Sequence, residues 1–117
     1  MLAVYWLGLV TGTHLPRLPQ GVGGYDDKTA HYLAYAGLAF LLSWSWSVRR
    51  PYFPKGLLFA LGVAVLFGAV DELTQIPVPG RFGEPLDWLA DSLGALSGIC
   101  LFSCLYVMWH AWSAQRQ

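Results

Sequence analysis

The chain has 117 residues, of which 56% are hydrophobic and only 12% are charged, and its mean hydropathy is +0.46. Ordinary soluble domains carry about 25% charged residues, so the composition argues against a water-soluble protein and for one small integral membrane domain over residues 1–117. The formal net charge is zero, which excludes a nucleic-acid partner held by bulk electrostatics.

Long apolar runs predict an all-α bundle of about four transmembrane helices. A hydrocarbon core about 30 Å thick needs roughly 20 apolar residues in helical form. The predicted helices cover residues 1–13, 29–48, 56–76 and 88–112. The first run is short, since at about 1.5 Å per residue it extends only about 20 Å. It has neither a basic start nor a small-residue cleavage site, so we expect a tilted helix or a thinned bilayer rather than a signal peptide.

The charged residues divide between the two ends of this bundle. Arg49, Arg50 and Lys55 fall on the same side as Arg116. The opposite side receives the other three basic residues, Arg17, Lys28 and Arg81, so the basic count is four against three. It also receives all the acidic residues, namely Asp26, Asp27, Asp71, Glu72, Glu84, Asp87 and Asp91. Basic residues favour the cytoplasmic side. We therefore expect a multi-pass protein of the cell membrane, with both termini in the cytoplasm and the acidic loops outside.

Helical spacing gathers polar residues at the outer end. Residues three, four or seven apart return to one face of a helix. The predicted stripes are Lys28, His31 and Tyr35; Leu61, Val65, Gly68, Glu72 and Gln75; and Asp87, Asp91, Gly94 and Gly98. The Gly94-x-x-x-Gly98 spacing lets helices approach closely in lipid, so packing of the glycines would turn Asp87 and Asp91 inward.

These stripes predict a polar extracytoplasmic pocket. Ionisable groups in membrane helices are costly unless they pair or face a polar cavity. The predicted pocket residues are Lys28, His31, Glu72, Gln75, Arg81, Asp87 and Asp91. Asp71 is about 100° around its helix from Glu72 and would face Arg81 or the headgroups. His14 reads as a loop residue without a partner.

The pocket residues allow a metal site or a set of ion pairs. Imidazole and carboxylate ligands suit a divalent cation, and the candidates are His31, Glu72, Asp87 and Asp91. The alternative needs no metal: Glu72 and Asp87 pair with Lys28 and Arg81 and tie the helix ends together.

A phosphate site is a further alternative. Arg81 would grip phosphate oxygens with Lys28 beside it, and His31 or Glu72 would be the candidate catalytic residue that moves protons. The excess of acids over bases opposes a bare anion, and no Ser, Cys or Thr nucleophile is clearly placed.

Three stretches together resemble the motifs of the VanZ-like family, in the same order. They read "DKTAHYLAYAGLAFLL", "DELTQIPVPGR" and "EPLDWLADSLGALSG". The motif positions are Asp27, Lys28, His31, Glu72, Gln75, Arg81, Asp87, Asp91 and Gly94. The chain departs from the pattern at Asp91, where the family often has Asn, and in its short first helix.

The resemblance implies a small multi-helix membrane protein linked to glycopeptide (teicoplanin) tolerance, and it adds Asp27 to the binding residues. Three functions follow. The protein binds membrane lipids, a lipid-linked cell-wall precursor or a glycopeptide; or it is an enzyme acting on a lipid-linked phosphate; or its polar residues only tie the helices together.

Overall fold

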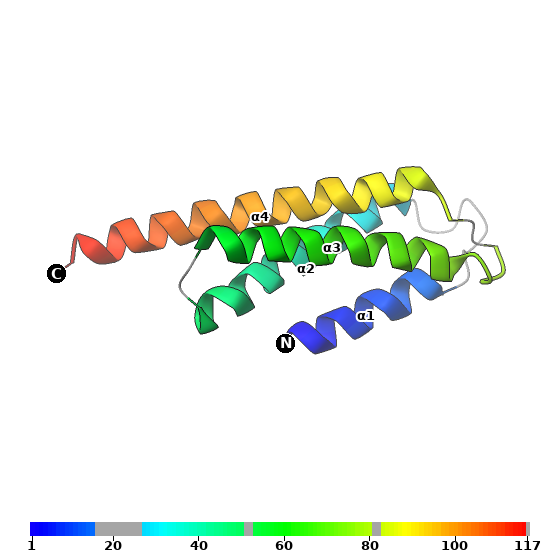
Figure 1. Cartoon of the computed structure of the whole chain (residues 1–117), viewed down its shortest axis with the longest axis horizontal. Coiled ribbons are helices and arrows are strands. Elements are labelled where there is room, and N and C mark those ends of the chain that lie inside the picture. The colour runs from blue at the N-terminus through cyan, green and yellow to red at the C-terminus, as the bar shows by residue number, and fades with distance from the viewer. Residues whose placement is uncertain (16–26, 51–52, 81–82, 117) are drawn as a thin grey trace.

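The computed structural model describes residues 1–15, 27–50, 53–80 and 83–116, which form four α-helices and no strand (Figure 1). Their bounds are α1 (Leu2–His14), α2 (Asp27–Arg49), α3 (Phe53–Gln75) and α4 (Pro85–Ala114). This confirms the all-α fold and the short first helix. α1 begins partway along the bundle, whereas α4 extends beyond the other helices at its C-terminal end (Figure 1).

α3 and α4 begin three residues earlier than the sequence predicts. Each has a proline in its first turn, Pro54 in α3 and Pro85 in α4. Proline is favoured there because its fixed φ suits the helix and its missing N–H would have no intrahelical acceptor. Asp87, which the sequence placed in the loop before the helix, therefore lies in the first turn of α4. A carboxylate in that position is stabilised by the helix dipole.

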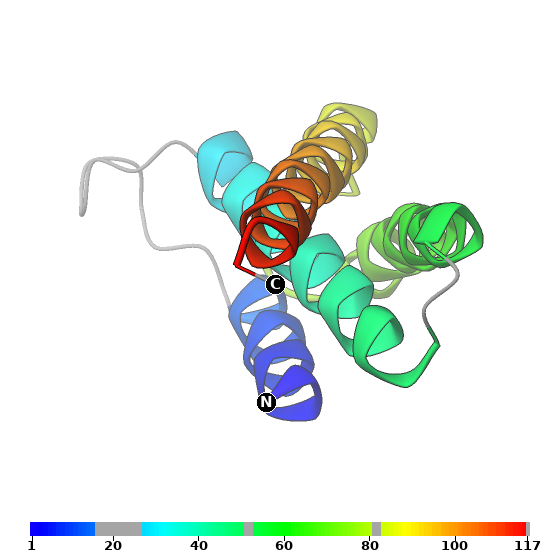
Figure 2. The ribbon, with the colours of Figure 1, turned by 90° about the vertical axis from the view of Figure 1, so that its left-hand side faces the viewer.

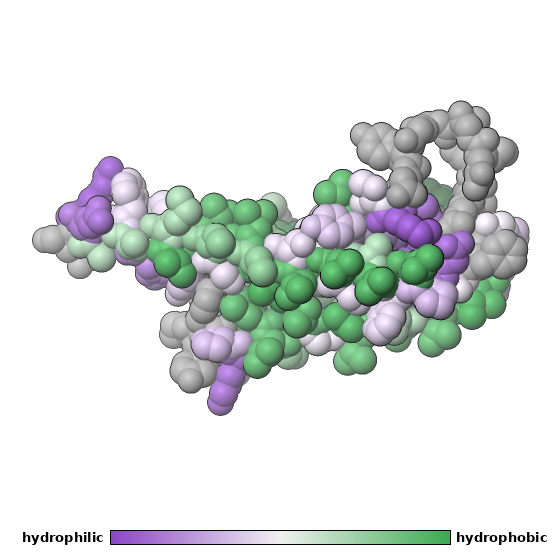
Figure 3. Space-filling model, turned by 90° about the horizontal axis from the view of Figure 1, so that it is seen from above, coloured by the Kyte–Doolittle hydropathy of each residue, from purple (hydrophilic) through white to green (hydrophobic). Residues whose placement is uncertain are grey.

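Two of the described helices are long and apolar enough to cross a membrane, by length and composition. They are Pro54–Gln75 in α3 and Pro85–Ala114 in α4. Large apolar side chains such as Leu66 and Leu101 point outward from these helices. The space-filling view shows apolar residues across the middle of one face and hydrophilic residues toward its ends (Figure 3).

α2 and α3 form the centre of the bundle. Each packs against the other three helices, whereas the described residues make no contact between α1 and α4 (Figure 2). The core consists of Leu9, Tyr35, Leu38, Ala39, Leu42, Ala60, Ala64, Ala95 and Ile99. Because α3 lies between other helices, two different faces of this helix are buried.

The predicted small-residue seam is confirmed where α2 meets α4. A Cβ atom added to Gly94 would collide with the carbonyl oxygen of Tyr32, and one added to Gly98 would collide with that of Ala36. The tyrosine hydroxyl of Tyr32 also donates a hydrogen bond to Ser97 Oγ, at 2.6 Å. This close approach carries the first turns of α4, with Asp87 and Asp91, against α2.

Aromatic side chains dock the short helix α1. The Tyr5 hydroxyl donates a 2.7 Å hydrogen bond to the Ala34 carbonyl of α2. Trp6 meets Phe67 of α3 edge to face, with ring centroids 5.0 Å apart. Such ring pairs contribute about 0.5–1.5 kcal/mol beyond their buried area. α1 is thereby fixed beside α2 and α3, with its C-terminal end at the polar end of the bundle.

Candidate functional site

Three predicted site residues meet in the interior at the polar end. His31 comes from α2, Glu72 from α3 and Asp91 from α4, and we call them the acid–histidine cluster. His31 Nδ1 lies 2.9 Å from Asp91 Oδ1 and 3.9 Å from Glu72 Oε1. The three residues are 3%, 7% and 0% exposed, respectively. The cluster thus joins the three long helices through buried titratable groups.

Each carboxylate of the acid–histidine cluster has one oxygen bound and one left over. Glu72 Oε2 accepts the backbone N–H of Glu84 at 2.9 Å, and Asp91 Oδ1 lies against His31. Among the described residues, Glu72 Oε1 and Asp91 Oδ2 are buried without a hydrogen-bond partner. Gly68 makes room for the second of these, since a Cβ there would lie 3.1 Å from Asp91 Oδ2. Unsatisfied buried oxygens are uncommon and call for an explanation.

An ion pair nearer the surface links α2 to α4. Lys28 Nζ lies 3.3 Å from Asp87 Oδ1 and 3.3 Å from Glu84 Oε2. The negative charge of Asp87, and then its hydrogen bond and that of Glu84, raise the pKa of the Lys28 ammonium group, which precedes the predicted span 29–48. The pairing of Asp87 with Lys28 agrees with the ion-pair alternative. Glu72 instead lies against His31 and the Glu84 backbone.

A second buried network ties α1 to α3, and we call it the Asp71 network. The Thr13 hydroxyl donates to Asp71 Oδ1 at 2.9 Å, and the Gln75 amide donates to Asp71 Oδ2 at 3.0 Å. His14 ends α1, with Nε2 3.0 Å from Thr74 Oγ1. Both carboxylate oxygens of Asp71 are therefore satisfied.

The sequence interpretation was wrong about His14, which belongs to α1 and has partners. Of the two alternatives for Asp71, exposure to the headgroups is wrong, because Asp71 is buried between helices, and a contact with Arg81 lies outside the described residues. Sequence reasoning also missed Thr13. The available signal was its spacing of four from Leu9, which places both residues on one face of α1. In the structure both of these residues are buried.

A cavity of about 270 Å³ lies between α1 and α2 at this end of the bundle. Most of its wall is apolar, and its polar contributors are Thr13, Asp27 and His31. The lining residues are Gly8, Leu9, Gly12, Thr13, Asp27, Ala30, His31 and Ala34. The cavity therefore touches both the Asp71 network and the acid–histidine cluster.

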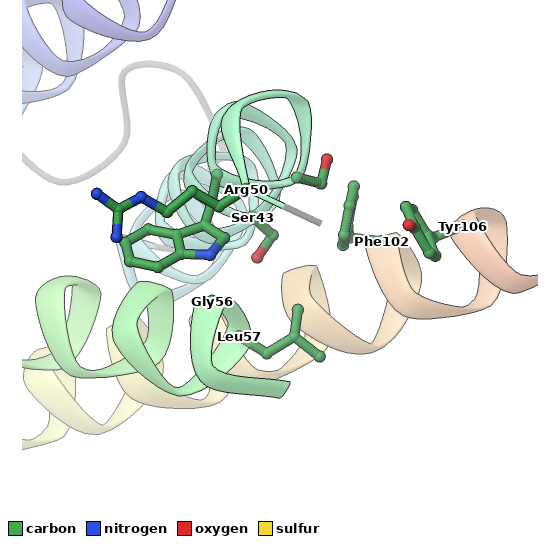
Figure 4. Close-up of a pocket in the computed structure, with 8 residues that line it drawn as sticks. Ser43, Arg50, Gly56, Leu57, Phe102 and Tyr106 are labelled. Atoms are coloured by element: carbon green, nitrogen blue, oxygen red, sulfur yellow. The ribbon is translucent and has the colours of Figure 1, made fainter. Parts of the chain in front are cut away.

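A second cavity, at the opposite end, is far smaller. Its volume is about 10 Å³, which is roughly the space of one water molecule. Figure 4 shows Ser43 of α2, Arg50 directly after α2, Leu57 of α3, and Phe102 and Tyr106 of α4 around it. Of these two cavities, the one large enough for more than a water molecule lies at the polar end.

The structure brings most of the predicted pocket residues together. Lys28 pairs with Asp87, and His31 lies against Glu72 and Asp91. Asp27 lines the larger cavity. Gln75 belongs to the Asp71 network. Arg81, predicted to bind an anion, lies outside the described residues.

The candidate metal and catalytic residues can be placed as well. His31, Glu72 and Asp91 offer ligand atoms within 4.8 Å of one another, as do Asp27, His31 and Asp87. In the part of the chain that the structure describes, the hydrogen-bond partner of His31 is Asp91, and no hydroxyl or thiol is bonded to its ring. This arrangement can hold a cation or a proton between helices.

The sequence profile of the VanZ/LLP1 family matches residues 10–108. The match runs from within α1 to near the end of α4 and contains every residue of the acid–histidine cluster and the Asp71 network. No curated protein and no solved structure matches the chain. Because the match covers most of the sequence, the chain belongs to the VanZ/LLP1 family.

Proposed function

We propose that this member of the VanZ/LLP1 family is a multi-pass membrane protein that binds an amphiphile of the cell envelope in the cavity between α1 and α2. The ligand is the headgroup end of a membrane lipid or of a lipid-linked precursor, and its binding contributes to glycopeptide tolerance. The cavity is the observation that supports this proposal, because an apolar wall and a polar end occur in one space of about 270 Å³.

The lining of the cavity matches the two parts of an amphiphile. Gly8, Gly12 and Ala34 supply small apolar surface, against which a hydrocarbon segment can pack. Asp27 and His31 supply polar groups at the end of the bundle. Ligand pockets are commonly about 300–1,000 Å³ and mostly apolar with a few polar groups, so this cavity suits a headgroup and the first part of a chain.

The charge of the pocket favours a headgroup that carries an ammonium group. Asp27 lines the cavity, and Glu84 and Asp87 lie close by against Lys28. The described residues of this end thus hold more acids than bases. An ammonium group facing Asp27 would complement them, whereas a bare phosphate would be repelled.

Membrane topology is the second element of the proposal. The described basic residues Arg49, Arg50 and Lys55 lie where α2 ends and α3 begins, and Arg116 follows α4 at the same end of the bundle (Figure 1). With four spans, this end faces the cytoplasm and the cavity faces outward. A periplasmic-type reporter fused after residue 117 should be inactive and a fluorescent cytoplasmic reporter active, and the reverse result would reject this orientation.

Native mass spectrometry of the detergent-purified protein tests the cavity. Gly12→Leu adds a side chain to the cavity wall, and a Cβ at Gly12 meets nothing within 4 Å, so the fold should tolerate it. Gly62→Leu is the matched control, because Gly62 is an exposed helical glycine of α3 with equally open space around it. Bound lipid should be present in the wild type and in Gly62→Leu and lost in Gly12→Leu. Equal lipid retention by all three proteins would reject the cavity as the site.

The link to glycopeptide tolerance depends on the family resemblance and needs its own test. A susceptible host that produces the wild type should require a higher inhibitory concentration of teicoplanin than the same host with an empty vector. Gly12→Leu should lower this protection, and Gly62→Leu should not. If the wild type gives no protection, the proposed role in tolerance is rejected, and the proposal of lipid binding is judged by the mass spectrometry alone.

A structural role is the second candidate, and the Asp71 network favours it. The Thr13 hydroxyl of α1 donates to one oxygen of that carboxylate and so holds α1 against α3, and Gln75 of α3 satisfies the other oxygen. If the polar residues serve only this purpose, substitutions in them will lower the thermal stability and leave lipid retention unchanged.

A further inference from the structure

We infer that the acid–histidine cluster is a binding site for one divalent transition-metal ion, of the kind of Zn²⁺ or Mn²⁺, held by His31, Glu72 and Asp91. This inference goes beyond the proposed function, because the three ligands can hold a metal whether or not an amphiphile enters the cavity. Of the two candidate ligand sets, it selects His31, Glu72 and Asp91 over Asp27, His31 and Asp87.

The separations between the three side chains are those of ligands around one ion. All three offer ligand atoms within 4.8 Å of one another. His31 Nδ1 is 2.9 Å from Asp91 Oδ1 and 3.9 Å from Glu72 Oε1. Ligand atoms that each lie about 2.0–2.2 Å from a metal are about 3–4 Å apart, as these are.

The unsatisfied oxygens are an independent sign of a ligand. Glu72 Oε1 points toward His31, and neither it nor Asp91 Oδ2 has a hydrogen-bond partner among the described residues. The side chains of Glu72 and Asp91 are 9% and 0% exposed. A buried carboxylate oxygen without a partner costs free energy that coordination to a cation would recover.

The charge of the cluster points in the same direction. Two carboxylates beside one imidazole carry a net charge of −2 when both carboxylates are ionised and the ring is neutral, and a divalent ion would cancel it. Lys28 is engaged with Asp87 and Glu84 nearer the surface, at 3.3 Å from each. Ionisable groups at membrane depth are costly without such compensation.

The donor atoms select the class of metal. Ca²⁺ and Mg²⁺ prefer oxygen ligands alone, whereas imidazole nitrogen suits zinc and other transition metals and carboxylate also suits manganese. One nitrogen and two carboxylates therefore favour Zn²⁺ or Mn²⁺. Three protein ligands leave at least one coordination position. Since His31 also lines the cavity, water or a ligand group can reach the ion from that side.

The alternative ligand set fits less well. Asp27 is only partly buried, and Asp87 Oδ1 already lies 3.3 Å from Lys28 Nζ. A cation there would compete with the lysine ammonium group for the same oxygen. Among the described residues, no lysine or arginine forms an ion pair with Glu72 or Asp91.

Metal binding by the full chain in detergent tests the inference. Protein stripped with a chelator is given ZnCl₂ or MnCl₂ alone, and the bound metal is measured by elemental mass spectrometry after gel filtration and by titration calorimetry. The variants are Glu72→Gln, which removes a ligand charge, and Asp71→Asn, which makes the same change on the adjacent buried residue of the Asp71 network. We expect one ion per chain in the wild type and in Asp71→Asn, and at least about ten-fold weaker binding in Glu72→Gln.

The absence of binding to the wild type with both metals would overturn the inference, as would equal affinity of the wild type and Glu72→Gln. If Glu72→Gln cannot be purified, Gly68→Ala replaces it, because its methyl group would crowd Asp91 Oδ2 at 3.1 Å without removing a ligand. Metal should raise the unfolding temperature of the wild type and of Asp71→Asn more than that of Gly68→Ala; equal shifts would place the ion elsewhere. Gly12→Leu should keep the metal while losing lipid, so failure of this inference and failure of the proposed function are distinguishable.

Discussion

Asp71 and Glu72 are adjacent in the chain and both buried, yet their surroundings differ completely. Asp71 faces α1, whose Thr13 donates a hydrogen bond to Oδ1, while Gln75 of α3 itself donates one to Oδ2. Glu72 faces α2 and α4, where Oε2 accepts the Glu84 N–H and Oε1 has no hydrogen-bond partner within the described ranges. Neighbouring residues point about 100° apart on a helix, and α3 packs against helices on both sides.

This difference gives two adjacent residues of α3 different roles, a structural one for Asp71 and one in ligand binding for Glu72. A carboxylate with every oxygen satisfied by protein donors stabilises the fold and has no capacity left for a ligand. A buried carboxylate with a free oxygen costs stability until a proton or a cation arrives. We therefore interpret the Asp71 network as the structural contact that holds α1. We interpret the acid–histidine cluster as the proposed metal-binding site.

The largest expected effect is that of Asp71→Ala. It leaves Thr13 and Gln75 without their acceptor, and hydrogen bonds to a charged group contribute about 1.5–3 kcal/mol each, so the free energy of unfolding should fall by about 3 kcal/mol or more. Chemical unfolding in detergent, followed by tryptophan fluorescence, measures this. Glu72→Ala should cost clearly less in metal-free protein. Equal losses for the two variants would remove the distinction between the two residues.

Thr13→Val should have the next largest effect, about 1.5–2 kcal/mol, because it removes the hydrogen bond to Asp71 while keeping the shape of the side chain. A double-mutant cycle with Asp71→Ala should give a coupling energy of about 1 kcal/mol or more. The exposed Thr11, whose hydroxyl bonds only to the Leu7 carbonyl of its own helix among the described residues, provides the control Thr11→Val. Additive losses would show that Thr13 does not act through Asp71.

A change of charge alone should have opposite signs at the two positions. In metal-free protein Glu72→Gln removes an uncompensated buried charge and should leave the free energy of unfolding unchanged or raise it by about 1 kcal/mol. Asp71→Asn weakens a satisfied acceptor and should lower it by about 1 kcal/mol. Saturating ZnCl₂ should reverse the order of the wild type and Glu72→Gln. A loss of stability in metal-free Glu72→Gln would contradict this reading of the cluster.

The inward faces of the long helices could be predicted because helical spacing is a local property. The stripe of Asp87, Asp91, Gly94 and Gly98 is buried throughout, as the sequence indicated. The glycines explain why, since their lack of a side chain lets α4 lie against the backbone of α2.

The partners across helices could not be predicted in the same way. Thr13 and Asp71 are 58 positions apart, and spacing within one helix does not say which face meets which neighbour. The sequence predicts a loop at His14 because this residue begins a connection, residues 14–27, that is rich in Pro and Gly. In the structure His14 is the last residue of α1, and its ring contacts Thr74 of α3.

The smallest effect is expected for Lys28→Gln, which removes the charge of a half-exposed side chain at the polar end of the bundle. The side chain of Lys28 is 41% exposed, and such ion pairs are screened by salt. The unfolding temperature should fall slightly, and the difference from the wild type should shrink as the salt concentration rises from about 50 to about 500 mM. Because Asp87 raises the pKa of Lys28, this contribution is present below the pKa of lysine in the unfolded chain and is lost as the pH rises through the higher value of the folded state. Thermal unfolding at pH 7 and at strongly alkaline pH checks this. A difference that is independent of salt and persists at alkaline pH would mean that Lys28 acts through packing of its methylene groups. The contact of Lys28 with Asp87 would then be structural, like the Asp71 network.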